Sequence, residues 1–180
     1  MTSEAKPRIK VTYATLRADN EDLHSGFEEA ATKVRGELGA SYQNYVDGAW
    51  RDGVGTFEAR SPIDTEILLG TFASGTPADI DDAVAAARRA QPAWAATPWR
   101  ERLAILRRAA DLISDRLFEY SATQSYEVGK NRIEALGEVE ESADLIRYYA
   151  ETMEDNDGYA PPMGTLGEPP AHRKRSLRPP

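Results

Sequence analysis

Residues 125–130 read Ser-Tyr-Glu-Val-Gly-Lys, and this short stretch lies between two long amphipathic segments. Apolar side chains recur three and four positions apart on both sides of it, which is typical of helices that bury one face. Gly129 is the natural break between the segments, because glycine readily adopts the left-handed conformation that ends helices. The pattern therefore predicts helices over 98–125 and 131–155, joined by a turn at Gly129.

Two more helices are predicted upstream. Thr76, Pro77 and Asp79 have the spacing of a capping box with proline in the first turn, so we expect a helix over 79–91 that ends at Pro92. Its apolar side consists of Ile80, Ala83, Val84, Ala87 and Ala90. A first helix is expected near 20–38, with Asp19 or Asn20 as its cap, one buried stripe, and Gly39 as its end.

Short strands are predicted between these helices. Asp47-Gly48 within residues 45–50 is a strong hairpin signal, residues 61–65 form a turn, and residues 67–71 form a compact strand. Residues 9–16 alternate as a short edge strand would. The expected fold class is α-rich, with a small β-sheet or hairpin and about four helices. The expected divisions are an extension over 1–41, a central unit over 42–158 and a proline-rich basic tail over 159–180.

Composition excludes several classes of protein. The 180 residues carry a net charge of −8, and the four basic residues after position 171 leave the first 171 with a net of −12. Such an acidic body repels nucleic acid. The chain has no cysteine, and therefore no disulfide or Cys-based metal site. No stretch approaches the roughly 20 apolar residues that span a bilayer, and no secretory signal is visible, so we expect a cytoplasmic protein without membrane contact.

Two loop motifs fail on inspection. A phosphate loop ending at Gly129-Lys130 needs glycine where Gln124 stands and Ser or Thr where Asn131 stands, so Lys130 is predicted to be a solvated side chain. A calcium loop around Gly158 needs oxygen ligands where Met153 and Gly164 stand.

The remaining polar residues show no site pattern. His24 and His172 are isolated in sequence, and we expect His24 to be a solvated helix residue. Glu134 and Glu138 lie one helical turn apart, which is the pattern of a solvated face. There is no Gly-x-Gly-x-x-Gly after a strand. From the residues alone we expect no catalytic, cofactor-binding or metal-binding residue.

The order and spacing of these pieces from about residue 42 to residue 158 nevertheless resemble the N-terminal part of NAD(P)-dependent aldehyde dehydrogenases. The pieces are the hairpin at 46–50, the turn at 61–65, the alanine-rich helix that ends near Trp94, and the Glu-Val-Gly-Lys turn. The segments 10–39, 61–64 and 153–158 together look like the glutamate-γ-semialdehyde (1-pyrroline-5-carboxylate) dehydrogenases of proline breakdown.

That resemblance implies an α/β fold with a doubly wound NAD-binding domain, a catalytic domain and a β-arm exchanged between the subunits of a homo-oligomer. It implies a cysteine nucleophile, NAD as cofactor in the complete enzyme, and a cleft-facing acidic residue that Glu138 matches and that can meet the substrate's ammonium group. Because this chain has no cysteine, we expect an N-terminal fragment that is inactive and binds no cofactor alone, with exposed apolar stripes.

The partner implied for such a fragment is an aldehyde dehydrogenase subunit or the missing downstream segment. The alternative is a non-catalytic interaction module that pairs with a full-length or separately encoded subunit.

Overall fold

The computed structural model describes residues 19–159, which form five α-helices, one short 3-10 helix and two small sheets. The helices are α1 (Glu21–Glu37), α2 (Pro77–Ala96), α3 (Trp99–Asp115), α4 (Leu117–Val128), α5 (Arg132–Asp155) and η1 (Asp157–Tyr159). The strands are β1 (Ala40–Tyr42), β2 (Asn44–Val46), β3 (Ala49–Arg51), β4 (Thr56–Arg60) and β5 (Leu68–Ala73). The expected α-rich fold class with a small sheet is confirmed.

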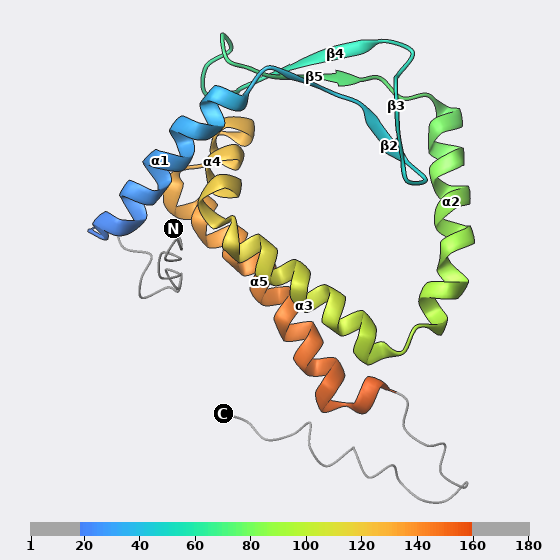
Figure 1. Cartoon of the computed structure of the whole chain (residues 1–180). Coiled ribbons are helices and arrows are strands. Elements are labelled where there is room, and N and C mark those ends of the chain that lie inside the picture. The colour runs from blue at the N-terminus through green and yellow to red at the C-terminus, as the bar shows by residue number, and fades with distance from the viewer. Residues whose placement is uncertain (1–18, 160–180) are drawn as a thin grey trace, which may run out of the picture.

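The helices α1, α3, α4 and α5 pack together, whereas α2 stands apart from them (Figure 1). The strands connect the two parts, and α3 runs back from the end of α2 along α5 (Figure 1). The core lies where α1, α4 and α5 meet; its buried apolar residues are Leu23, Phe27, Val34, Leu117, Ala122, Leu136 and Val139. The stripe predicted for the first helix is therefore the face that it buries.

The sheets are formed by short-range and medium-range pairing. Strands β2 and β3 form the predicted hairpin, whose two turn residues, Asp47 (φ 54°) and Gly48 (φ 81°), both have positive φ. In the other sheet β5 is central, parallel to β1 and antiparallel to β4. The turn predicted over 61–65 joins β4 to β5, and the strand predicted over 67–71 is β5.

The prediction that Pro92 ends the second helix is wrong, because α2 continues to Ala96. Proline removes one backbone donor, but it does not prevent the following residues from closing the helix. The N–H of Thr97 donates to the carbonyls of Ala93 and Trp94, which completes the last turn. The capping box at the other end is present as predicted, with Thr76 and Asp79 bonded to each other's backbone.

The single helix predicted over 98–125 is also wrong, since it is divided into α3 and α4 at Arg116 (φ −107°, ψ 22°). The Arg116 side chain pairs with Glu119 and bonds to the Tyr120 hydroxyl, which stabilises the break. The break lets α3 pack against α5 while α4 packs against α1. Periodicity could not reveal it, because the apolar spacing continues through the break without Gly or Pro.

Several predictions lie outside the described residues, namely the edge strand over 9–16, His172 and all but the first residue of the tail over 159–180. The helix predicted over 131–155 is confirmed as α5. No helix within residues 19–159 combines the length and the apolar character that crossing a membrane requires.

Candidate functional site

The turn at Gly129 reverses the chain within three residues. Gly129 has φ +76° and ends α4 in the left-handed conformation. Asn131 then caps α5, its side-chain oxygen accepting the N–H of Glu134 at 3.0 Å. This tight reversal brings the first turns of α5 alongside the last turns of α4.

Glu138 lies at the centre of the polar cluster that this reversal creates. Its carboxylate accepts a hydrogen bond from Nε2 of Gln124 at 2.8 Å and forms an ion pair with Lys130. The Glu138 side chain is 47% exposed and that of Lys130 is 30% exposed. The solvated Lys130 expected from the sequence is therefore wrong: the ammonium group is committed to Glu138. The carboxylate is held in place and remains open to solvent.

The turn over 61–65 packs against the same reversal from the other side. The buried hydroxyl of Ser61 donates to the backbone carbonyl of Tyr126 at 2.5 Å. A Cβ atom on Gly129 would lie 3.4 Å from Ile63 and 3.6 Å from Pro62. Two stretches of the family resemblance, about 65 residues apart in sequence, thus meet in space and fix the position of the Glu138 cluster.

Replacing Ser61 with alanine should destabilise the protein by about 1–3 kcal/mol, because the Tyr126 carbonyl near the end of α4 loses the hydrogen bond from the fully buried Ser61 hydroxyl. Urea denaturation followed by circular dichroism measures the change. The matched control is Ser25→Ala, which removes an exposed hydroxyl that bonds to the Asp22 carbonyl and should change stability by less than about 0.5 kcal/mol. Equal effects of the two substitutions would contradict a role for Ser61.

His24 is not the solvated residue expected from the sequence. Its Nδ1 lies 3.0 Å from the guanidinium of Arg132, which also pairs with Glu28 and lies over the ring of Phe27 at 5.1 Å. These contacts connect α1 to the start of α5, so the role of His24 is structural. No group of three potential ligands among the described residues could hold a metal ion.

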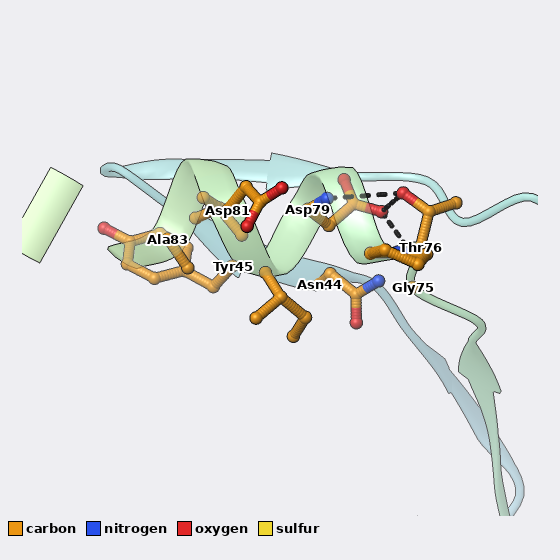
Figure 2. A pocket seen from close by; sticks show the side chains of 10 residues that line it. Asn44, Tyr45, Gly75, Thr76, Asp79, Asp81 and Ala83 are labelled. Carbon is orange, nitrogen blue, oxygen red and sulfur yellow. Dashed lines mark hydrogen bonds between the residues drawn. The ribbon is translucent and has the colours of Figure 1, made fainter. Parts of the chain in front are cut away.

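A second candidate is a pocket of about 840 Å³ between β2 and the start of α2 (Figure 2). It is lined by Asn44, Tyr45, Val46, Gly75, Thr76, Pro77, Asp79, Ile80, Asp81 and Ala83. Hydrogen bonds from the backbone and the hydroxyl of Thr76 hold the pKa of Asp79 below its usual value, so this carboxylate serves the helix cap (Figure 2). The Thr76 hydroxyl and the Asp79 carboxylate, which are bonded to each other in this pocket, are both used by the helix cap.

The described residues do not fit a dinucleotide. A pyrophosphate binds at a helix N-terminus whose N–H groups and positive dipole are free to meet it. Every α-helix within residues 19–159 carries an acidic residue in its first turn; these are Glu21, Asp22, Asp79, Glu101, Glu119 and Glu134. At α2, the helix that follows β5, the carboxylate of Asp79 already accepts the Thr76 donors.

Comparison with known proteins places this scaffold, which carries the Glu138 cluster beside a Glu-Val-Gly-Lys turn, in one enzyme family. Residues 50–178 match the model of the aldehyde dehydrogenase family. The chain belongs to the aldehyde dehydrogenase family, as the sequence resemblance predicted.

Particular members of the family show which of its enzymes this chain is similar to. A 1-pyrroline-5-carboxylate dehydrogenase of Staphylococcus saprophyticus is 32% identical over 89% of this chain and 30% of its own length. The solved structure of a 1-pyrroline-5-carboxylate dehydrogenase from Thermus with bound NAD superposes with a TM-score of 0.77 at 31% identity, covering 94% of this chain and 32% of that one. An N-succinylglutamate 5-semialdehyde dehydrogenase of Caulobacter vibrioides is 38% identical over 63% of this chain and 24% of its own. The chain thus spans about a third or less of the relatives it matches.

Proposed function

We propose that this chain is the N-terminal part of an NAD-dependent aldehyde dehydrogenase that oxidises glutamate-γ-semialdehyde to glutamate. The observation that carries the proposal is the agreement of sequence and fold with the 1-pyrroline-5-carboxylate dehydrogenases over nearly the whole chain. The substrate carries an α-ammonium and an α-carboxylate at the end remote from its aldehyde, so a specific enzyme needs charged side chains at that end of the cleft.

In this proposal, the chemistry requires polypeptide beyond these 180 residues. A thiolate nucleophile cannot come from a chain without cysteine. The described residues also offer no fit for the dinucleotide that accepts the hydride. The catalytic cysteine and the NAD site are therefore proposed to lie in parts of the family fold outside these 180 residues. This chain contributes scaffold and one wall of the aldehyde cleft.

Glu138 is the residue proposed to meet the substrate. Its carboxylate is held by a neutral amide donor from Gln124 and by Lys130, and about half of its side-chain surface is exposed. A positioned carboxylate favours an ammonium group through a charge-assisted hydrogen bond, which contributes more than a bond between neutral groups. Glu138 thereby selects aldehydes that carry a free amine.

The similarity to an N-succinylglutamate 5-semialdehyde dehydrogenase supports a second candidate substrate. N-acylation turns the α-ammonium into a neutral amide, which gains no ionic attraction from Glu138. The two candidate substrates therefore differ in the group that would face Glu138. A substitution of Glu138 should change the rate with one substrate and not with the other.

The test is a hybrid enzyme in which this chain replaces the corresponding segment of the Thermus 1-pyrroline-5-carboxylate dehydrogenase. We expect NADH formation from glutamate-γ-semialdehyde, and Glu138→Gln should lower kcat/KM roughly tenfold to a hundredfold through the loss of one charge-assisted hydrogen bond. Glu141→Gln, an exposed change on the same helix, is the matched control and should leave the rate within about twofold.

The hybrid should oxidise the N-succinylated aldehyde poorly, and Glu138→Gln should not alter that rate. A folded hybrid that prefers the N-succinylated aldehyde would replace the proposed substrate with the second candidate. A hybrid that oxidises only simple aldehydes would refute both.

A further inference from the structure

The carboxylate of Glu138 carries a donor on each of its oxygens. Lys130 pairs with Oε1, and Nε2 of Gln124 donates to Oε2 at 2.8 Å. A carboxylate has about four lone-pair sites, so roughly half of its capacity to accept hydrogen bonds is still available. Because the side chain of Glu138 is 47% exposed, that capacity is open to a ligand from solution.

Gln124 closes the inner side of this carboxylate. Within residues 19–159, the other end of its amide, Oε1, is buried and meets no hydrogen-bond donor. Exchanging the two ends of the amide would set Oε1 against the carboxylate of Glu138, which is also an acceptor. The amide therefore keeps its Nε2 on Glu138. A ligand reaches the carboxylate on the side of Lys130, whose side chain is 30% exposed.

The pair of Glu138 and Lys130 is electrically neutral, and this decides which ligand charges it favours. A second cation on the same carboxylate would lie only about 4–5 Å from the Lys130 ammonium, because both are within hydrogen-bond distance of one group. The two cations would repel each other. A ligand with an ammonium group and no negative charge beside it therefore loses part of the attraction that an isolated carboxylate would offer.

We propose that Lys130 makes this site specific for a zwitterion, in which an ammonium and a carboxylate are bonded to the same carbon atom. In that group the nitrogen and the carboxylate carbon are about 2.5 Å apart. The ammonium can then meet Glu138 while the carboxylate meets Lys130, whose ammonium has three donors and gives one to Glu138. The substrate class is therefore the aldehydes of α-amino acids, and not amino aldehydes in general.

This inference rests on the proposed function and extends it from one charge of the substrate to both. Glutamate-γ-semialdehyde carries such a zwitterion. Without its carboxylate it becomes γ-aminobutyraldehyde, a monocation, and without its ammonium it becomes glutarate semialdehyde, a monoanion. The three aldehydes differ only at this end, so their relative rates measure what the pair of Glu138 and Lys130 recognises.

The hybrid enzyme described above, which contains the full chain, tests the role of Lys130. Lys130→Met removes the charge and keeps the length of the side chain. It should lower kcat/KM for glutamate-γ-semialdehyde relative to that for γ-aminobutyraldehyde roughly tenfold. Lys130→Arg keeps the charge and should largely preserve this ratio. Comparing variants of one hybrid cancels the equilibrium between each open aldehyde and its cyclic imine.

Two further variants separate the effect of charge from an effect on folding. Glu138→Gln leaves Lys130 without its partner, so glutarate semialdehyde should gain several-fold over γ-aminobutyraldehyde. The matched control is Lys33→Met, which breaks an exposed ion pair with Glu119 and should leave all ratios within about twofold. A loss of stability alone would lower the rates with all three aldehydes together and leave their ratios unchanged.

A ratio that Lys130→Met does not change would overturn this inference and leave the proposed function standing, because the hybrid would still oxidise glutamate-γ-semialdehyde. A wild-type hybrid that oxidises γ-aminobutyraldehyde as well as glutamate-γ-semialdehyde would overturn it too. A hybrid that is active on simple aldehydes and inactive on glutamate-γ-semialdehyde would refute the proposed function, and this inference with it.

Discussion

The purified 180-residue chain is expected to form no NADH from glutamate-γ-semialdehyde or from any simple aldehyde. The thiolate that attacks the carbonyl in this family has no counterpart, because none of the 180 residues is cysteine. Three buried serine hydroxyls are already engaged: Ser61 donates to the Tyr126 carbonyl, Ser114 to Glu140 and Ser121 to the Leu117 carbonyl. The buried Ser125 hydroxyl has no hydrogen-bond partner among the described residues, and therefore no base there that could activate it.

The nitrogen bases His24 and Lys130 are engaged as well. The one histidine within residues 19–159, His24, is held against Arg132, and Lys130 is paired with Glu138. The loss is therefore complete, and neither pH nor added NAD should restore activity. Absorbance at 340 nm measures it, with an intact 1-pyrroline-5-carboxylate dehydrogenase as the positive control. NADH formation proportional to the amount of this chain would contradict the proposal that the nucleophile lies outside these 180 residues.

Replacing Arg147 with alanine should cause the largest loss of stability among single polar substitutions, about 2–4 kcal/mol. Arg147 lies between α3 and α5, where its guanidinium donates to Glu140 at 3.1 Å and to the Ser114 hydroxyl at 2.9 Å. It also donates to the carbonyl of Ala110 at 3.3 Å and to Asp144 at 3.0 Å. Burial lowers the pKa of Arg147, but the surrounding carboxylates more than offset this and leave the pKa above its usual value.

The cost arises chiefly from what remains behind. Without Arg147 the carboxylate of Glu140, only 16% exposed, keeps Ser114 as a donor but loses its counter-charge. Denaturant unfolding measures the loss. The matched control is Arg107→Ala, which breaks the more exposed pair of Arg107 with Glu154 between the same helices and should cost less than about 1 kcal/mol. Similar losses for the two arginines would show that exposure does not separate them.

The sequence was informative wherever structure depends on residues close together in the chain. The capping box of Thr76 and Asp79, the hairpin at Asp47-Gly48 and the helix end at Gly129 were all predicted, because each depends on the backbone preferences or bonds of a few neighbouring residues. The buried stripe of α1 was predicted because period 3.6 identifies one face of a helix. The order and spacing of these pieces also predicted the family.

Only the tertiary structure decided which of these pieces meet. No local signal pairs Ser61 with Tyr126, sets Lys130 and Gln124 on Glu138, or divides a helix at Arg116 so that its halves pack against different partners. No repeating pattern in the sequence links the residues that make these contacts. The energies of the contacts also depend on burial, which exists only in the folded chain. Amino-acid order therefore specified the helices and the turns, whereas the position of the Glu138 carboxylate was set by packing.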